Sequence, residues 1–163
     1  MLIGGSFASV NGTSQSNLAR LNLDGSLDLT YSNALSGVSQ LALQKDGKVL
    51  VTGGFTNING VERRYLARLN IDGSLDETFL DGVAGPVYSL AIQDDGKIVI
   101  ASDFGPTGTP EERYLARLNQ DGSVDASFLT DMSGPDWIVR TVCLQPDGKI
   151  FIGGFLTRAT VYL

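Results

Sequence analysis

The residues of this chain that could do chemistry recur in one motif, Asn-x-Asp-Gly-Ser-x-Asp, with an arginine two positions before the Asn. Its side-chain oxygens fall at alternating positions, as in a calcium-binding loop. An EF-hand loop also needs an acid at its first position and Glu at its twelfth. In that register the first position is Arg20, Arg68 or Arg117, and the twelfth is Tyr31, Phe79 or Phe128. A cation repels a metal ion and an aromatic ring offers no carboxylate. The sequence therefore disfavours calcium and predicts no cofactor.

The same motif has a structural interpretation, which we favour. Asn and Asp side chains in tight turns bind nearby backbone N–H groups, and we expect this of Asp24, Asp72 and Asp121. Each repeated arginine shares a strand face with an apolar residue, so we expect it to lie along that face and to pair with an Asp. For Arg68 the sequence leaves two partners open, Asp72 and Asp76.

The chain contains few of the residue types that common catalytic sites need. The chain has no His and one Cys, which excludes a His-containing triad, a His/Cys zinc site and an internal disulfide. Cys143 stands where the other copies have Ala42 and Ala91, so we expect a small buried residue there. Most Asp residues belong to repeated turns. We therefore expect no enzyme, although a paired-carboxylate hydrolase stays open.

Composition and charge indicate a folded domain with a core, and they limit its partners. The 163 residues are 42% hydrophobic and 18% charged, with a net charge of −6. No basic stripe is present to neutralise phosphates, so neither nucleic acid nor an anionic membrane surface is an expected partner. The first residues lack the charged start and apolar run of a signal peptide, and no run is long enough for membrane insertion.

Two recurring blocks must position these residues. One block, Leu-Ala-Arg-Leu-Asn-x-Asp-Gly-Ser-x-Asp, spans residues 18–28, 66–76 and 115–125 at offsets of 48 and 49, with Val124 replacing Leu in the last copy. A period of this length indicates one supersecondary unit that packs on its neighbours. The other block has an apolar run, Asp-Gly and a second apolar run, and occupies residues 38–51, 87–100 and 139–152. This pattern predicts a β-hairpin.

The hairpins and the first block together predict the blades of a β-propeller. The second run of each hairpin is continuously apolar, which is typical of a strand buried on both faces. After a loop at residues 57–64, residues 65–70 predict a third strand, and residues 75–80 are long enough for a short fourth. Three or four antiparallel strands per repeat match a propeller blade. We expect one all-β repeat domain over residues 1–163, with a partial blade at 1–37, blades at 38–86 and 87–138, and a partial blade at 139–163.

The copies differ mainly in two loops, which is where a propeller carries differences in binding. Residues 105–112 change in composition, and residues 131–137 carry extra length and the only Trp. Trp137 and Tyr88 could stack on a sugar ring, although a lone Trp in a loop often serves as a packing plug. The candidate ligand- or partner-binding residues of the loops are Pro106, Glu111, Glu112, Asp136 and Trp137.

The repeat as a whole resembles a known family. Gln-x-Asp-Gly-Lys-Ile-x-Ile-x-Gly-x-Phe, followed by Tyr-Leu-Ala-Arg-Leu-Asn-x-Asp-Gly-Ser-x-Asp-x-x-Phe, is similar to the delta-60 repeat of bacterial surface and phage-associated proteins. The resemblance covers nearly the whole chain. It implies a β-propeller without catalytic residues, at the cell surface, outside the cell or in a virion. The last copy departs from the pattern, because Leu156 takes the place of the aromatic residue and no Tyr-Leu-Ala-Arg-Leu follows.

About three repeats and one strand are fewer than the roughly four to eight blades of a closed propeller. We therefore expect an incomplete ring, either a piece of a longer protein or a ring closed by association of copies. Residues 160–163 are another source of a third strand for the last blade. The leading functional hypothesis is a non-enzymatic structural or interaction module that presents loops to a protein partner. The alternatives are a carbohydrate-binding propeller and a propeller hydrolase or lyase.

Overall fold

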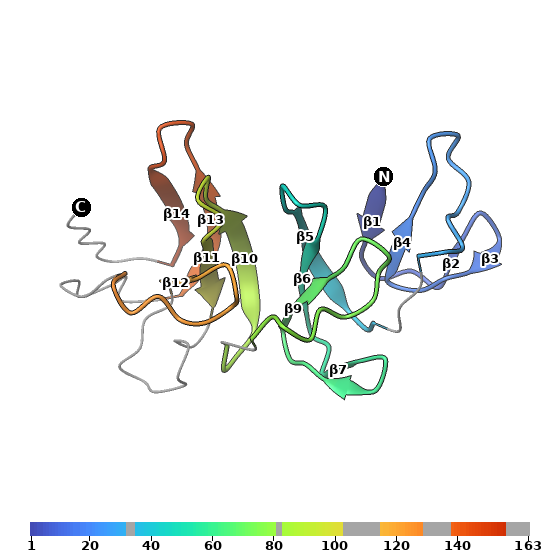
Figure 1. The fold of residues 1–163 in the computed structure, drawn as a ribbon, viewed down its shortest axis with the longest axis horizontal. Helices are drawn as coiled ribbons and strands as arrows, with labels where there is room; N and C mark the ends of the chain where they lie inside the picture. Colours follow the sequence, from blue (N-terminus) through green and yellow to red (C-terminus); the bar gives the residue numbers. More distant parts are fainter. Residues whose placement is uncertain (32–34, 81–82, 103–114, 129–137, 156–163) are drawn as a thin grey trace. The chain divides into compact units, whose positions relative to one another are not determined.

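The computed structural model describes residues 1–31, 35–80, 83–102, 115–128 and 138–155. These residues form small antiparallel β-sheets joined by turns and contain no helix (Figure 1). Consequently, none of them belongs to a helix that could span a membrane. The chain divides into two compact units, Met1–Glu77 and Thr78–Leu163. The blade limits given above stay predictions.

The first unit contains a three-stranded sheet and a two-stranded sheet that follow the same plan. In the former the strand order is β5 (Val38–Leu43), β6 (Val49–Gly53) and β9 (Leu66–Leu69). In the latter, β1 (Leu2–Gly4) pairs with β4 (Leu18–Arg20), as β6 pairs with β9. The core of this unit includes Leu18, Tyr31, Val51, Phe55 and Leu69.

The second unit also contains a three-stranded sheet and a two-stranded sheet, and its two-stranded sheet consists of a hairpin. Its three-stranded sheet has the order β10 (Val87–Ile92), β11 (Ile98–Ser102) and β12 (Leu115–Leu118). Its other sheet pairs β13 (Val139–Leu144) with β14 (Ile150–Gly154), and no third described strand joins it. β13 packs against β10 and β11. The core between these strands includes Val99, Ala101, Leu115, Val139 and Val142.

The three predicted hairpins, β5–β6, β10–β11 and β13–β14, are confirmed. Gly47, Gly96 and Gly148 take φ values of +85°, +83° and +85°, which glycine adopts without steric cost. The Asp before each Gly accepts the backbone N–H of the following Lys, at 3.0–3.2 Å. The register of each hairpin shifts once, near the start of its first strand.

The prediction that the second hairpin strand is buried on both faces is confirmed twice and is wrong once. Every residue of β6 and of β11 is buried. On β14, however, the Phe151 side chain is 55% exposed. The reason is the sheet order: β6 and β11 are central strands, whereas β14 has β13 as its only described neighbour.

Of the three or four strands left open for each repeat, the fourth does not form at residues 75–80. Leu75 makes a single bridge to Leu69, after which the chain turns. The turn forms because the Asp76 N–H donates to Arg68 O while the Arg68 side chain binds the Asp76 carboxylate. The chain thereby leaves the sheet, and Phe79 ends buried against Gly122. A complete blade therefore has three strands.

The loop predicted at residues 57–64 contains a hairpin of its own. β7 (Asn57–Ile58) pairs with β8 (Val61–Glu62) across Asn59 and Gly60, whose φ values are +51° and +85°. β2 (Ser9–Val10) and β3 (Thr13–Ser14) form the same hairpin in the first copy. Two consecutive positive φ values define the tight turn that Asn-Gly favours.

Cys143 is exposed, so the expectation of a small buried residue is wrong. Ala42 and Ala91, its equivalents, are half-buried, and Ala91 packs on the core of the second unit. Cys143 lies opposite Phe151 in the hairpin, and the Phe151 side chain is also exposed, at 55%.

Candidate functional site

The charged residues of the repeat converge on one Asp carboxylate per copy. In the second copy, Arg68 Nε and Lys48 Nζ each donate to Asp76 Oδ2 at 2.7 Å. Arg68 lies on β9, Lys48 ends the turn before β6, and Asp76 follows β9. The Arg68 and Asp76 side chains are 11% and 4% exposed. This buried cluster, and its equivalents in the other copies, is called the corner cluster.

The third copy repeats the corner cluster with both cations. Arg117 Nε and Lys97 Nζ donate to Asp125 Oδ2 at 2.8 Å, and Ser127 donates its N–H and hydroxyl to Asp125 Oδ1. Both carboxylate oxygens are therefore occupied. The first copy has the arginine alone, since Arg20 Nε donates to Asp28 Oδ2 at 2.7 Å.

Of the two partners left open for Arg68, the structure pairs it with Asp76. Asp72 instead accepts the N–H and hydroxyl of Ser74, at 2.9 and 2.7 Å. Asp24 and Asp121 do the same in their copies, so the Asp residues of the motif hold turns. The motif Asn residues differ from expectation, because each donates its amide N–H to the Ser hydroxyl at 2.9 Å: Asn22, Asn70 and Asn119.

These contacts lower the pKa values of the carboxyl groups they reach. The Lys97 ammonium, then the Ser127 hydroxyl, holds the pKa of Asp125 far below its usual value. Ser74 lowers the pKa of Asp72, and Thr30 followed by Arg20 lowers that of Asp28. A general acid at neutral pH needs a raised carboxyl pKa. The repeated Asp residues are therefore suited to ion pairs and turns rather than to proton donation.

In two places an aromatic side chain packs on a glycine turn further along the chain, once within each unit. The ring of Tyr31 lies 3.1 Å from the position that a Cβ would take on Gly73, and the ring of Phe79 lies 3.0 Å from that on Gly122. Both glycines also take positive φ values, +90° at Gly73 and +88° at Gly122, which glycine adopts without steric cost. Arg20 also lies over the Tyr31 ring, at 4.5 Å from its centroid, and donates to Ile71 O.

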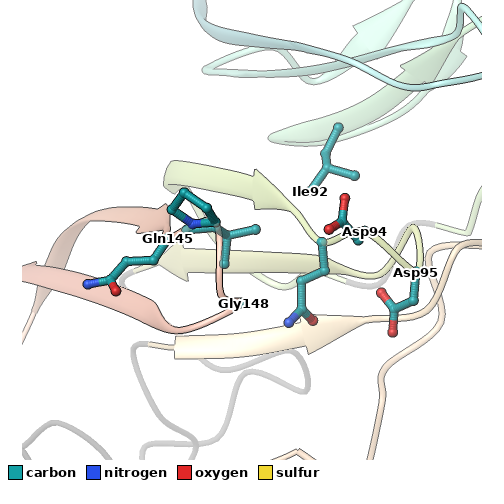
Figure 2. A pocket seen from close by; sticks show the side chains of 8 residues that line it. Ile92, Asp94, Asp95, Gln145 and Gly148 are labelled. Carbon is teal, nitrogen blue, oxygen red and sulfur yellow. The ribbon is translucent and has the colours of Figure 1, made fainter.

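The second unit also has an open groove of about 500 Å³ between two hairpin turns (Figure 2). Ile92 and Leu144 contribute apolar surface to it. Gln93, Asp94 and Asp95 line it from the β10–β11 turn, and Gln145, Pro146 and Gly148 line it from the β13–β14 turn. The Gln93 amide oxygen is buried and has no hydrogen-bond partner, but the same holds for its repeat equivalent, the Gln44 oxygen.

The sequence-predicted loop residues, Pro106, Glu111, Glu112, Asp136 and Trp137, lie outside the described residues. Tyr88 is described, and the Arg140 guanidinium lies over its ring at 4.1 Å from the centroid. One ring face of Tyr88 is therefore engaged within the protein. In the described part of the chain, no three His, Cys, Asp or Glu side chains are placed to hold a metal ion.

Sequence reasoning missed the lysines of the corner cluster. Lys48 and Lys97 lie 28 residues before their Asp partners, so no local spacing relates them. The available signal was that the Asp-Gly-Lys turn recurs with the same period as the Arg and the Asp.

The repeated three-stranded antiparallel sheets, each with its own corner cluster, are typical of a repeat protein of the β-propeller class. A comparison with protein families supports this class directly. The family described as "Domain of unknown function (DUF5122) beta-propeller" matches residues 1–31, 44–79 and 93–128, which is more than half of the chain. The chain belongs to this family. A search of the curated proteins gave no match.

Proposed function

We propose that this chain is a non-enzymatic structural or interaction module, a β-propeller scaffold that presents turns and loops to a protein partner or to further copies of itself. One observation carries the proposal: the Arg and Asp residues that recur in every copy are engaged in ion pairs or turns within that copy. Arg68, Lys48 and Asp76 form a buried cluster, and Asp72 holds a turn. These residues therefore stabilise the sheets, and we expect partners to bind to turns and loops outside the corner clusters.

The electrostatics of the repeat support the absence of catalysis. A carboxyl pair that hydrolyses glycosides needs one group with a raised pKa, whereas the pKa values of Asp28, Asp72 and Asp125 are lowered. The arginine beside each Asp also opposes a calcium ion there. The net charge of −6 argues against nucleic acid as the partner.

The finer assignment to the delta-60 repeats belongs to the proposal as well. It is supported by the Gln-x-Asp-Gly-Lys and Tyr-Leu-Ala-Arg-Leu-Asn sequences at their shared period. With it comes a location at the cell surface or in a virion, where such a scaffold would display its loops to a partner.

Turnover assays test the proposal most simply. The chain is incubated with a panel of chromogenic glycosides and soluble polysaccharides, and product is compared with that of a heat-denatured control. The proposal predicts no difference. Turnover that a single acidic substitution such as Asp94→Asn abolishes would establish a hydrolase or lyase and overturn the scaffold proposal.

Carbohydrate binding is the second candidate, and the groove of Figure 2 is the observation that favours it. Amide and carboxylate groups beside apolar surface suit the hydroxyls and ring faces of a sugar. Titration calorimetry with the same polysaccharides tests this function. Binding that Asp94→Ala weakens would support the groove, and binding that only Trp137→Ala abolishes would place the glycan at the loop of residues 131–137.

A further inference from the structure

The turn between β7 and β8 places an asparagine directly before a glycine, Asn59-Gly60, at an exposed hairpin tip. The turn between β2 and β3 does the same with Asn11-Gly12. No other Asn of the sequence precedes a glycine. In such a pair, the side-chain carbonyl carbon of Asn and the backbone nitrogen of Gly can close a five-membered ring. These two tips are therefore the places where the chain can react with itself.

The surroundings of Gly60 leave room for this ring closure. Asn59 and Gly60 are both exposed, and no described residue lies within 4 Å of the position that a Cβ would take on Gly60. Glycine has no side chain to hinder an approach to its nitrogen. Among the described residues, no backbone carbonyl accepts the Gly60 N–H, so that nitrogen is not held in the hairpin ladder.

The tip of this hairpin should also open at small cost. β7 and β8 contain two residues each. A two-stranded hairpin is marginally stable by itself, and short exposed elements open locally more often than the whole chain unfolds. In the closed turn Asn59 has a φ of +51°. Ring closure requires the Asn59 backbone to rotate out of this turn, and local opening permits that rotation.

The reaction needs only water. The deprotonated Gly60 nitrogen attacks Cγ of Asn59, the N–Cγ bond forms, the Cγ–Nδ2 bond breaks, and ammonia leaves. The product is a cyclic imide. Water then adds to one of its two carbonyl carbons and breaks the bond between that carbon and the nitrogen. Opening at Cγ gives aspartate, whereas opening at the main-chain carbonyl carbon gives isoaspartate, in which the backbone runs through Cγ.

We propose that Asn59 is a site of spontaneous modification and that its isoaspartate product unpairs the β7–β8 hairpin. Asn11, in the same turn of the first copy, is a second site of this chemistry. Each conversion adds one negative charge to the net charge of −6. The reaction needs neither a partner nor an enzyme, so it goes beyond the scaffold role and is tested separately from it.

The two products differ in their effect on the hairpin. Asp-Gly suits the same tight turn as Asn-Gly, so aspartate at position 59 leaves the hairpin in place. Isoaspartate adds one carbon atom to the main chain of a two-residue turn. Because turn length fixes the register of a hairpin, Ile58 can then no longer lie opposite Val61. Ile58 is fully buried in the core of the first unit, together with Phe55. The isoaspartate form therefore loses part of this core.

Ageing of the full chain tests the modification. The chain is held at about 37 °C, at about pH 6 and about pH 8.5, for about four weeks, and its peptides are then mapped by mass spectrometry. We expect a gain of about 1 Da at Asn59 and at Asn11. The gain should be faster at the higher pH, because the attacking nitrogen must lose its proton.

Asn57 and Asn70 are controls within the same chain, since each precedes an isoleucine. The branched side chain of Ile crowds the attacking nitrogen, so Asn59 should convert at least about five-fold faster than either control. No gain in mass at Asn59 after the incubation at the higher pH would overturn the proposal. Equal rates at Asn59 and the two controls would also overturn it.

A charge-matched variant tests the unpairing. In an Asn11→Asp background, the aged acidic fraction, whose isoaspartate content is measured by peptide mapping, is compared with the unaged Asn59→Asp variant. Both carry the new charge, but only the aged fraction contains the longer backbone. An unpaired hairpin exposes Arg63 and Arg64, so trypsin should cleave after them at least about five-fold faster in the isoaspartate form. Equal cleavage rates would overturn the unpairing.

Discussion

Arg68 joins strand β9 to the turn that follows it, and its partner Asp76 is almost fully buried. Removing the guanidinium takes from that buried carboxylate one of the two cations that bind its Oδ2 atom, the other being Lys48. We expect Arg68→Ala to lower the free energy of unfolding by more than about 2 kcal/mol, since breaking a buried pair leaves an uncompensated charge. Urea denaturation measures this loss.

Arg64→Ala is the matched control for Arg68→Ala. Arg64 pairs with Glu62 at 2.9 Å, but the two side chains are 57% and 73% exposed. Exposed pairs contribute little, so the change should stay within about 0.5 kcal/mol. If Arg68→Ala also costs less than about 0.5 kcal/mol, the corner cluster does not hold the blade.

Because of Asp125, the free energy of unfolding should depend on pH in the acidic range. Its pKa in the folded chain lies below the unfolded value of about 3.9, so the ionised carboxylate favours the folded state. That contribution is complete above about pH 5 and is lost as the pH falls through the folded pKa. We expect the free energy of unfolding to decrease between about pH 5 and pH 2, and Asp125→Asn to show a shallower decrease. Urea denaturation across this range measures both slopes, and equal slopes would argue against the pairing.

At the scale of the element, β6 depends on a close approach of two backbone segments. A Cβ on Gly53 would overlap the carbonyl oxygen of Gly37, whereas a Cβ on Gly54 would meet nothing within 4 Å. Gly53→Ala should therefore lower the free energy of unfolding by about 1–3 kcal/mol, and Gly54→Ala by less than about 0.5 kcal/mol. Thermal and urea unfolding measure both losses. Equal losses for the two variants would show that the close approach of Gly53 to Gly37 does not limit the side chain at this position.

The elements were predictable where a local signal specifies them. Asp46-Gly47 between apolar runs predicts the β5–β6 hairpin, because the turn needs a positive φ that glycine supplies. Asn59-Gly60 is an equally clear signal for the β7–β8 hairpin, which the prediction of a loop at residues 57–64 did not include. Residues 75–80 are long enough for a strand, but the chain turns after the Leu69–Leu75 bridge, where the Asp76 carboxylate binds Arg68. Asp76 and Glu77 are residue types that strands disfavour, and they were the sequence signal against a strand there.

The candidate site was only partly predictable. Repetition showed that the arginine and the Asp residues act together, but spacing alone could not choose Asp76 over Asp72. Lys48 joins the cluster from the preceding hairpin, which only the fold brings near. The exposure of Cys143 was not predictable from its repeat equivalents, because Ala42 and Ala91 are half-buried.

At the scale of the whole molecule, the motif that resembles a calcium loop should not respond to calcium. Its Asp residues bind Ser hydroxyls, and an arginine lies beside each cluster. A ligand that binds only the folded state raises the Tm. We expect about 5 mM CaCl₂ to shift the Tm by less than about 1 °C relative to EDTA. A rise of several degrees that Asp72→Ala abolishes would identify a calcium site.

At the scale of the whole molecule, the β13–β14 hairpin is one of the places where large apolar side chains are exposed. Phe151 and Phe155 are 55% and 66% exposed and follow one another along the end of the same hairpin. Exposed apolar patches of this kind mark interaction surfaces. A scaffold that works through association should therefore associate in solution, by way of this sheet.

Light scattering of the chain across about 5–200 μM tests the scaffold account most directly, because it measures association without assuming a ligand. The account predicts a weight-average mass that rises above that of one chain with concentration, and a Phe151→Lys variant that stays at or near one chain. A single-chain mass at every concentration, or association that Phe151→Lys leaves unchanged, would contradict it.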